Sequence, residues 1–365
     1  MARIFILTPT LISADAVGND VLGMHRVLRR RGHEVHLFAD DWNVHGLNVR
    51  HAYEALSLEQ NWDDILIYHH SIGWNLGNSI LQNSRCRTIV KYHNVTPAEF
   101  FEGISEPHRW RCLEGRSQLT SIARAGHALY LSASAYNMKD LLAAGAGRDR
   151  TFVMAPFNEI ENLESLTPDL EILDKYSDSK VNLLMVGSVR PNKGHVGLIE
   201  AFARYYYDFD CNSRLFIVGA ESDDLAGYSQ KLRELIELLC LDGTVVFAGQ
   251  VSPEALKAYY LLSHAFLIAS EHEGFCVPLA EAMSMKLPVV GYATPAIDET
   301  IGDAGIIWNE REPSLLAESI SLLREDESTS VRLGGAGYDR YQEKFSNAVI
   351  EDQFLHAARA VGLEL

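Results

Sequence analysis

The feature that most constrains the fold is an alternation of short apolar segments with longer amphipathic segments, which runs along the chain twice. A short apolar run between turn residues is typical of a buried strand, and an apolar stripe of period 3.6 is typical of a helix. This alternation predicts βαβ units around a parallel sheet, because parallel strands need a crossover connection. We therefore expect an α/β fold with two doubly wound domains. The expected strands are residues 3–9, 33–40, 63–71, 87–94, 127–134 and 151–157, then 181–189, 213–219, 244–249, 265–270, 288–292 and 304–308.

An acidic, polar segment at residues 158–180 separates the two alternations. We expect it to link an N-terminal domain, residues 1–160, to a C-terminal domain, residues 161–345. A chain of 365 residues suits two domains better than one. The last helix, about residues 346–365, is expected to pack back on the N-terminal domain. Ligands of doubly wound sheets bind beyond the carboxyl ends of the strands, so we expect the chemistry in the loops after strands, facing a cleft between the domains.

The charge of the chain limits its partners. A formal net charge of -17 argues against nucleic acid, whose phosphates require a basic surface. The acidic excess lies entirely after residue 160, whereas residues 1–160 carry 16 Lys and Arg, 16 Asp and Glu, and ten of the 14 His. The N-terminal domain is therefore better suited than the C-terminal domain to approach an anionic surface or acceptor. Variation in surface composition without a function is the open alternative.

Cysteine usage and hydropathy indicate the compartment. Five Cys, odd in number and without a CxxC pair, predict reduced thiols in a cytoplasmic protein rather than a zinc site or a disulfide framework. The first apolar run is expected to be a buried strand, since no signal-peptide cleavage pattern follows it. No apolar run reaches the roughly 18 residues of a membrane span. Any membrane contact is therefore expected to be peripheral, at the inner face of the membrane and through the N-terminal domain.

Two loops of the N-terminal half carry candidate site residues. The loop after the first strand has one glycine, Gly18, where a dinucleotide-binding domain would have GxGxxG, so an NAD or FAD enzyme is not expected. Gly18 permits close approach of a ligand, and Asn19 or Asp20 is a candidate cap of the following helix. His93 ends the fourth strand, where a neutral imidazole can exchange a hydrogen bond with a sugar hydroxyl. A plain turn glycine and a histidine that merely ends a strand are the alternatives.

The loop after the first strand of the second half is a candidate anion site. It combines two glycines, Gly187 and Gly194, with two cations, Arg190 and Lys193, immediately before a helix. Backbone N–H groups, the helix dipole and the cations together suit a diphosphate. The GxxxxGK[ST] spacing of a P-loop is absent. An ordinary basic turn is the alternative.

Two acids flank an apolar run led by Pro278. Glu273 lies in the loop after the strand at residues 265–270, and Glu281 is expected in the first turn of the helix that Pro278 begins. The two carboxylates are therefore expected to face different parts of an extended ligand, while Gly274 lets the intervening N–H groups approach it. Each carboxylate can accept from neighbouring hydroxyls, as in a sugar or ribose diol. The alternative is that Glu281 only complements the helix dipole and Glu273 is solvated.

Residues 273–283 resemble the E-x7-E signature of the retaining glycosyltransferases of family four, which have the GT-B fold of two Rossmann-like domains facing a central cleft. Motifs similar to those of the family recur in its order along the C-terminal half, and the glycine loop and the strand-ending Tyr-His-Asn do so in the N-terminal half. The C-terminal motifs are residues 186–202, 215–219, 245–260, 270–283 and 302–308.

The resemblance implies a role for each candidate residue. Glu273 would hold hydroxyls of the transferred sugar, Glu281 would bind the ribose diol, and Lys193 would neutralise charge on the leaving diphosphate. His93 and Gly18 would contact the donor sugar and phosphate. Many members have arginine where this chain has Ser188, which leaves open whether Arg190 replaces it. The remaining donor-binding positions are the N–H groups of Gly274, Phe275, Cys276 and Val277, and Gly249 near the base.

The activity that the resemblance implies is hexose transfer, of mannose or glucose, from a UDP, GDP or ADP sugar to a saccharide or lipid-linked glycan in cell-surface polysaccharide biosynthesis. Configuration would be retained, and no metal or other cofactor is expected. The alternatives are a sugar-nucleotide epimerase or phosphorylase with the same fold and a non-catalytic nucleotide-sugar-binding protein. The donor base, the sugar, the acceptor and the oligomeric state stay open.

Overall fold

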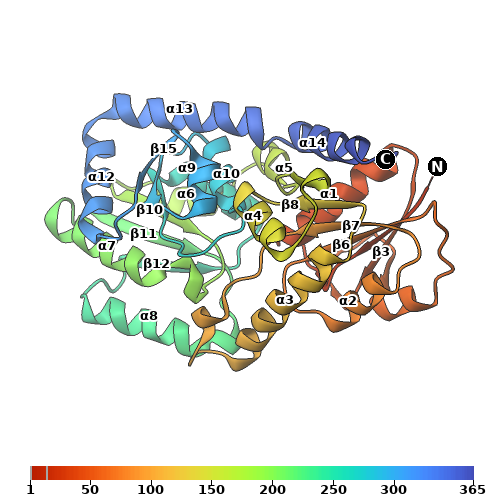
Figure 1. Cartoon of the computed structure of the whole chain (residues 1–365). Coiled ribbons are helices and arrows are strands. Elements are labelled where there is room, and N and C mark those ends of the chain that lie inside the picture. Colours follow the sequence, from red (N-terminus) through yellow and green to blue (C-terminus); the bar gives the residue numbers. More distant parts are fainter. Residues whose placement is uncertain (1, 14) are drawn as a thin grey trace. The chain divides into compact units, whose positions relative to one another are not determined.

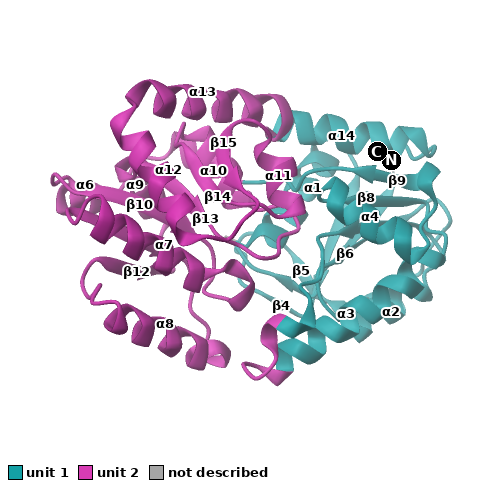
Figure 2. Cartoon of the chain, turned by 60° about the vertical axis from the view of Figure 1, so that its left-hand side comes forward, with its two compact units in different colours: residues 1–99, 107–158, 347–365 teal, residues 100–106, 159–346 magenta. Residues whose placement is uncertain are grey.

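The computed structural model describes residues 2–13 and 15–365. The chain forms two compact units, which Figure 1 shows in sequence colours and Figure 2 shows in teal and magenta. Unit 1 comprises residues 1–99, 107–158 and 347–365, and unit 2 comprises residues 100–106 and 159–346. The chain therefore contributes a short segment, residues 100–106, to unit 2, enters it again after residue 158 and returns to unit 1 for its last helix.

Unit 1 is built on a seven-stranded sheet in the order β5-β3-β1-β6-β7-β8-β9, and every pair in it is parallel. Strands β6 and β8 are buried along their whole length, as in parallel sheets covered on both faces. The strand bounds are β1 Arg3–Leu7, β3 Glu34–Ala39, β5 Val49–His51, β6 Ile65–His70, β7 Arg87–Tyr92, β8 Leu129–Ser132 and β9 Thr151–Val153.

The helices of unit 1 follow the strands as the alternation predicts. The stripe Val21, Met24 and Leu28 of α1 is 0% exposed, which confirms the apolar face expected for this helix. Helix α1 packs against β3, and α4 and α14 pack against β8. The bounds are α1 Ala16–Arg30, α2 Asn75–Gln82, α3 Glu106–Arg124, α4 Ala135–Ala144 and α14 Asn347–Ala360, with 3₁₀ turns at Ala52–Ser57, Ala98–Phe101 and Arg148–Arg150.

Three short strands of unit 1 were not expected from the sequence. They are β5 and the parallel pair β2 (Thr10–Leu11) and β4 (Asp41–Trp42). Their sequences, Val-Arg-His, Thr-Leu and Asp-Trp, contain no apolar run that would separate them from a loop.

Unit 2 has a six-stranded parallel sheet in the order β12-β11-β10-β13-β14-β15. Its strands are β10 Val181–Val186, β11 Ser213–Val218, β12 Val245–Gly249, β13 Ala265–Ile268, β14 Val289–Tyr292 and β15 Gly305–Trp308. Its helices are α5 Ile160–Ser165, α6 Leu170–Tyr176, α7 His195–Asp208, α8 Ala226–Leu238, α9 Pro253–Leu262, α10 Val277–Ser284, α11 Pro295–Ile301, α12 Pro313–Glu325 and α13 Glu327–Lys344, with 3₁₀ turns at Pro191–Lys193 and Asp223–Leu225.

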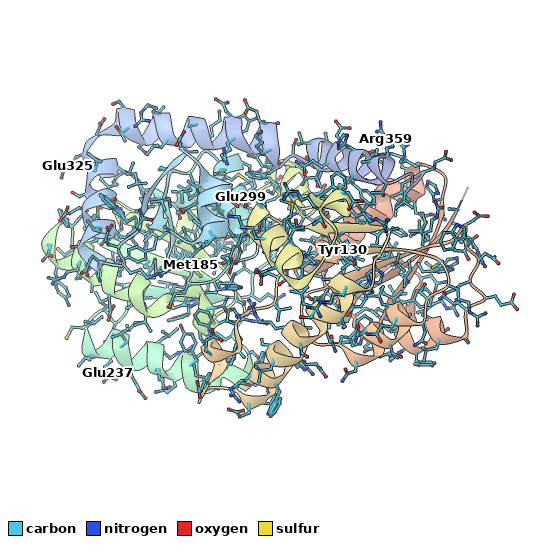
Figure 3. All side chains as sticks on the ribbon, in the orientation of Figure 1. Tyr130, Met185, Glu237, Glu299, Glu325 and Arg359 are labelled. Atoms are coloured by element: carbon cyan, nitrogen blue, oxygen red, sulfur yellow. The ribbon has the colours of Figure 1, made fainter. Side chains whose placement is uncertain are left out.

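Each unit has its own apolar interior. Met185 of β10 is 3% exposed and Tyr130 of β8 is 0% exposed, and both lie among densely packed side chains in Figure 3. Glu237, at the end of α8, is exposed to solvent. No helix among residues 2–13 and 15–365 is both long enough and apolar enough to cross a membrane.

The segment expected to be a linker is folded onto unit 2. Its apolar residues Ile160 and Leu163 are 0% and 5% exposed, and α5 and α6 pack against α9. From α9, Lys257 Nζ donates to the carbonyls of Glu164 and Leu166 at 2.5 and 2.7 Å, which satisfies carbonyls at the C-terminal end of α5. The polar composition of this segment concealed a helix with one buried face.

Both sheets reverse their strand order once. In unit 2 the chain runs outward from β10 through β11 to β12 and then from β13 through β14 to β15, so the reversal lies between β10 and β13. In unit 1 it lies between β1 and β6. Loops that leave the carboxyl ends of strands at such a point diverge and open a crevice, which is where ligands of doubly wound sheets bind.

Candidate functional site

The central feature of unit 2 is a pair of loops that leave β10 and β13 at the strand-order reversal. The first loop ends at Gly194, which has a φ of 68° and directly precedes α7. A side chain there would put its Cβ 1.9 Å from the carbonyl oxygen of Ala269 in the second loop. Glycine is therefore required at position 194 both by the backbone conformation and by the contact between the loops.

Asn192 joins the two loops with hydrogen bonds. Its carbonyl accepts from the N–H groups of Glu271 and His272 at 2.8 and 3.3 Å. Its side-chain Nδ2 donates to the carbonyl of His272 at 3.2 Å. The residue is 5% exposed, so these bonds are largely shielded from water and fix the second loop against the first.

The two loops bring Lys193 and Glu273 together, a contact that the sequence analysis did not predict. Lys193 Nζ donates to Glu273 Oε1 at 2.7 Å, and Ser270 Oγ donates to the same oxygen at 2.8 Å. The two charged side chains are 19% and 8% exposed. Desolvation lowers the pKa of Lys193, but the Glu273 carboxylate outweighs it and holds this pKa above its usual value. The pair is therefore a charged lysine beside a carboxylate, on the loops that follow β10 and β13 where the strand order reverses.

Arg311 supports the carbonyls before Glu273, and sequence reasoning missed it. Its guanidinium donates to the carbonyls of Ala269 and Ser270 at 2.9 and 2.8 Å. It also lies 5.3 Å from the centre of the Tyr292 ring, at cation–π distance. Arg311 is separated from this loop by two strands, so no local pattern could have revealed the contact.

The backbone between the loop and α10 has an unusual conformation. Cys276 precedes the helix with φ 78°, a left-handed conformation that is rare for residues other than glycine. Burial raises the pKa of its thiol, so the sulfur stays protonated and unreactive. The N–H groups of Gly274, Phe275, Cys276 and Val277 donate to no described residue, and those at the start of α10 add the positive end of its dipole. This backbone can receive an anion or a polar ligand.

Glu281 lies on α10, just beyond the first turn in which it was expected. The helix begins at Val277, so Glu281 is its fifth residue and Pro278 its second. The predicted position in the first turn is therefore wrong, and the alternative that Glu281 only complements the helix dipole is disfavoured, because Glu281 lies beyond that turn. Its Oε2 accepts from Tyr260 Oη at 2.7 Å, and burial raises its pKa. Tyr260 is 2% exposed and also donates to the Pro278 carbonyl at 3.2 Å, so it positions this carboxylate.

The other predicted residues of unit 2 lie on neighbouring loops. Ser188 is half-buried after β10, and Arg190 is exposed, with no hydrogen bond or ion pair from its guanidinium to a described residue. The charge of Arg190 acts to lower the pKa of Lys193, but this effect is smaller than that of Glu273, so the pKa stays above its usual value. Gly249 ends β12 with φ 69°, and no atom lies within 4 Å of where its Cβ would be. Lys193, Glu273 and Glu281 all lie near enough to Cys276 to shift the pKa of its thiol.

Gly18 and the cap of α1 differ from expectation. Gly18 lies inside the first turn of α1 rather than in the loop before it, and a Cβ there would meet the Ile12 carbonyl oxygen at 2.1 Å. The space at Gly18 is thus taken by the chain itself. The helix cap is Asp15, whose carboxylate accepts from the N–H groups of Val17 and Gly18 at 3.2 Å. The prediction that Asn19 or Asp20 caps the helix is wrong, because the helix begins at Ala16, before both residues.

His93 lies in unit 1, directly after β7, within a buried cluster. Its Nε2 is 2.9 Å from His69 Nδ1 and 3.5 Å from Asp20 Oδ2. Lys91 Nζ lies 3.7 Å from the same Asp20 oxygen and donates to the Met154 carbonyl at 2.5 Å. All four side chains are at most 7% exposed. His69 and Asp20 were not predicted as site residues, because they lie 24 and 73 positions from His93 along the chain.

Asp20, His69 and His93 also have the composition of a metal site, since one ligand atom of each lies within 4.8 Å of the others. Two features disfavour an ion there. The Lys91 ammonium already lies 3.7 Å from the Asp20 oxygen that would bind it. The 2.9 Å between the two imidazole nitrogens is a hydrogen-bond distance, at which one nitrogen carries a proton and cannot be a ligand.

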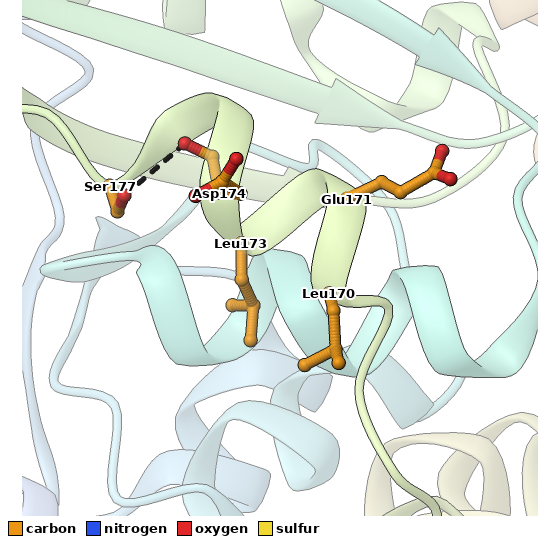
Figure 4. A pocket seen from close by; sticks show the side chains of 5 residues that line it. All are labelled: Leu170, Glu171, Leu173, Asp174 and Ser177. Carbon is orange, nitrogen blue, oxygen red and sulfur yellow. Dashed lines mark hydrogen bonds between the residues drawn. The ribbon is translucent and has the colours of Figure 1, made fainter.

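A shallow cavity of about 550 Å³ lies elsewhere on unit 2, along α6. Figure 4 shows Leu170 and Leu173 pointing to the same side of this helix and Ser177 bonded to the Asp174 carbonyl, at 3.2 Å. Its lining contains none of the predicted site residues.

Part of the chain is similar to a known protein family. Residues 171–340 match the family described as glycosyl transferases group 1. The serotype-specific mannosyltransferase WbdA of Escherichia coli is 30% identical over 139 residues, which cover 38% of this chain and 17% of that protein. The O-antigen chain mannosyltransferase B of Escherichia coli is 28% identical over 162 residues, which cover 44% of this chain and 41% of that protein. Both matches thus span less than half of the relative.

The similarity to solved structures extends over the whole chain. The crystal structure of Anabaena Alr3699/HepE in complex with UDP and glucose has a TM-score of 0.79 and 16% identity, and the match covers 99% of this chain and 100% of that chain. At this identity the similarity shows the fold alone. It confirms the α/β GT-B architecture of two Rossmann-like domains that the sequence predicted.

Proposed function

We propose that this chain, whose residues 171–340 match the family described as glycosyl transferases group 1, transfers a hexose from a nucleotide-diphosphate sugar to a saccharide or lipid-linked glycan. The two Escherichia coli relatives are named as mannosyltransferases, and one of them acts on O-antigen chains by its name. The Anabaena structure is a complex with UDP and glucose. These names support mannose or glucose as the sugar and polysaccharide biosynthesis as the setting.

The observation that carries the proposal is the Lys193–Glu273 pair at the strand-order reversal of unit 2. Lys193 uses one N–H on Glu273 and has two more, which suit an oxygen of a diphosphate. Glu273 uses Oε1 for Lys193 and Ser270, and its Oε2 accepts from no described residue. One carboxylate oxygen therefore remains for hydroxyls of the transferred sugar, directly beside the cation that faces its phosphate.

The charge that develops on the leaving diphosphate is met by protein groups. Lys193 and Arg190, whose guanidinium pairs with no described residue, supply positive charge, and the N–H groups before α10 supply donors that need no reorganisation. We propose that these groups stabilise the negative charge of the leaving diphosphate without a metal cofactor. Arg190 is the guanidinium of this loop.

The nucleotide is assigned to the other side of the same site. The Glu281 carboxylate, positioned by Tyr260, would accept from the ribose hydroxyls, since its Oε1 takes no bond from a described residue. Gly249, whose surroundings are open, would face the base.

We also propose that the anomeric configuration of the transferred sugar is retained, as the resemblance to family four implies. The acceptor hydroxyl would attack on the face from which the diphosphate leaves, and a diphosphate oxygen would take its proton. This scheme agrees with the site, since the described groups around Glu273 are a lysine cation, a serine hydroxyl and backbone, with no second carboxylate hydrogen-bonded to Glu273 as a nucleophile–base pair.

The acceptor is assigned to unit 1, in which His93 is the candidate for a contact with a sugar hydroxyl. Residues 1–160 are balanced in charge, unlike the acidic remainder. On α3, Trp110 and Leu113 are 63% and 40% exposed and lie beside the exposed Arg111. An exposed aromatic and aliphatic pair next to a cation suits the interface of an anionic membrane. We therefore place the protein in the cytoplasm, with peripheral contact at the inner face of the membrane.

A donor panel tests the proposed function. The purified chain is heated with UDP-glucose, GDP-mannose or ADP-glucose, and the unfolding temperature is read. A donor present at a hundred times its Kd stabilises the folded state by about 2.7 kcal/mol, so one donor should raise the unfolding temperature by several degrees. That donor should then lengthen an acceptor by one hexose, as read by mass spectrometry. A change of configuration at one sugar carbon of the free sugar nucleotide would indicate an epimerase. The absence of stabilisation by any of the three donors would contradict the proposal.

A further inference from the structure

The buried cluster around His93 leaves two polar atoms without a hydrogen-bond partner among the described residues. They are Asp20 Oδ2 and His69 Nε2. Asp20 Oδ1 is satisfied, because it accepts from the Phe157 N–H at 2.8 Å. The nearest groups to Asp20 Oδ2 are His93 Nε2 at 3.5 Å and Lys91 Nζ at 3.7 Å. A cluster with fixed positions and incomplete bonds constrains where its protons lie.

The two imidazoles share one hydrogen bond in their common plane. Their ring centres are 5.2 Å apart, their planes differ by 21°, and the bonding nitrogens are 2.9 Å apart. Burial lowers the pKa of His69 to about 3 and holds that of His93 well below its usual value, so both rings are neutral near pH 7. One ring therefore donates and the other accepts.

The Asp20 carboxylate decides which ring donates. If His93 Nε2 carries the proton, it donates to His69 Nδ1 and also faces Asp20 Oδ2 at 3.5 Å. If His69 Nδ1 carries it instead, that N–H lies 3.9 Å from Asp20 Oδ2, and the lone pair of His93 Nε2 faces the same oxygen at the shorter distance of 3.5 Å. A buried carboxylate beside a lone pair costs more than the neutral His69 Nε2–H that the first arrangement leaves without a partner. The first arrangement is therefore favoured.

We propose that Asp20 and His69 are positioning residues that hold His93 as its Nε2–H tautomer, so that Nδ1 of His93 is a hydrogen-bond acceptor for a hydroxyl of the bound sugar. His93 Nδ1 makes no hydrogen bond to a described residue, and the His93 N–H donates to the His70 carbonyl at 2.9 Å, which fixes the backbone. The identity of the ligand as a sugar rests on the proposed function. The tautomer does not.

The tautomer of the free protein tests the proposal directly. Long-range ¹H–¹⁵N spectra of the ¹⁵N-histidine-labelled chain near pH 7 distinguish a protonated from an unprotonated ring nitrogen, and His93→Gln assigns the signals. We expect His93 with Nε2 protonated and Nδ1 unprotonated. The opposite tautomer would overturn the proposal. This measurement needs neither substrate nor turnover, so it stands even if no donor is found.

Variants of the two positioning residues test the cause. In Asp20→Asn the amide oxygen can keep the Phe157 bond, while the amide N–H₂ takes the place of Oδ2 and donates toward His93 Nε2. The His93 tautomer should therefore switch. His69→Leu removes the acceptor and should mix the tautomers, whereas His69→Asn offers an acceptor in place of Nδ1 and should restore the wild-type pattern. Unchanged His93 signals in both Asp20→Asn and His69→Leu would overturn the proposed cause.

Kinetics separate positioning from mere stability. Asp20→Asn should lower kcat about tenfold, the size of one lost hydrogen bond in the transition state, with KM for the acceptor unchanged. His69→Asn should keep most of kcat. The matched control is His127→Asn, which changes another buried histidine of unit 1, bonded to Thr88 Oγ1 at 2.6 Å, and should leave kcat and the His93 signals unchanged. Equal loss of kcat in Asp20→Asn and His127→Asn would indicate a structural effect and contradict the assignment.

Discussion

Lys193 and Glu273 form an ion pair of 2.7 Å although 80 positions separate them in the sequence. The pair lies where the strand order of the unit 2 sheet reverses, between β10 and β13. Gly194 and Asn192 hold its two loops in contact. The fold thus prepares a cation and an acid side by side before any ligand arrives, which is the condition for electrostatic stabilisation without reorganisation.

Replacement of the cation should slow the chemical step. Lys193→Ala removes the charge proposed to face the leaving diphosphate, and kcat should fall about 10²–10³-fold, in the range seen when one such stabilising donor is lost. Steady-state transfer assays with the donor that stabilises the wild type measure this change. The control is Lys231→Ala, an exposed lysine on α8 that should leave kcat within error of the wild type. Equal rates for Lys193→Ala and Lys231→Ala would contradict the assigned role.

Removal of the tyrosine hydroxyl behind Glu281 should weaken donor binding. Tyr260→Phe deletes the 2.7 Å bond to Oε2, so the carboxylate loses its orientation. We expect the donor Kd to rise about threefold to tenfold, which corresponds to one hydrogen bond, with a smaller effect on kcat. Isothermal titration with the nucleotide diphosphate measures the change.

Tyr341→Phe is the matched control for this variant, because the Tyr341 hydroxyl is buried and has no hydrogen-bond partner among the described residues. It should bind the nucleotide as the wild type does. If Tyr260→Phe also binds with unchanged affinity, Glu281 does not hold the ribose in the way we propose.

Loss of the guanidinium that supports the Glu273 loop should reduce both stability and activity. Arg311→Ala leaves the carbonyls of Ala269 and Ser270 without their donors. We expect the free energy of unfolding to fall by about 1–3 kcal/mol and kcat to fall as well, because Ser270 and Glu273 would no longer be held in place. Urea denaturation and transfer assays measure the two effects. Arg204→Ala, at an exposed i,i+4 pair with Asp208, should change neither, and an unaltered kcat in Arg311→Ala would exclude a positioning role.

Buried histidines should make the protein less stable in mild acid. Burial lowers the pKa of His70 to about 4, from an ordinary value near 6.5. Below pH 6.5 the unfolded chain binds a proton at this residue and the folded chain does not, so stability is lost as the pH falls from about 6.5 to about 4. The slope from one such histidine is at most about 1.4 kcal/mol per pH unit.

His70→Gln should flatten this slope. Glutamine can donate to the Gly115 carbonyl, which His70 Nε2 contacts at 3.0 Å, and it does not titrate. Urea unfolding at several pH values between 4 and 7 measures the change. An equal slope in His70→Gln and wild type would show that His70 is not a source of the acid sensitivity.

The sequence predicted the parts of the site that depend on local pattern. The strands before Lys193 and Glu273 are apolar runs, and the loops after them carry glycine, cations and acids at short range. For this reason the loops and the GT-B fold could be recognised. The direct bond between Lys193 and Glu273 could not, because it depends on which strands are neighbours in the sheet.

The errors have the same origin. Aspartate is a common helix-capping residue. Asp20, however, lies a full turn inside α1, where it faces His69, Lys91 and His93 instead of free N–H groups. Asp15 performs the capping. Tyr260 and Arg311 were missed because a tyrosine on an apolar helix and an arginine after a strand have no local signal of their contacts. Side chains that position others across the fold require the structure.

The most direct test of the account is the crystal structure of the chain soaked with the nucleotide sugar that stabilises it. We predict hydroxyls of the transferred sugar within hydrogen-bond distance of Glu273 Oε2 and a diphosphate oxygen within that distance of Lys193 Nζ. A sugar nucleotide bound with both side chains still paired only to each other, or bound at another place on the molecule, would contradict the account.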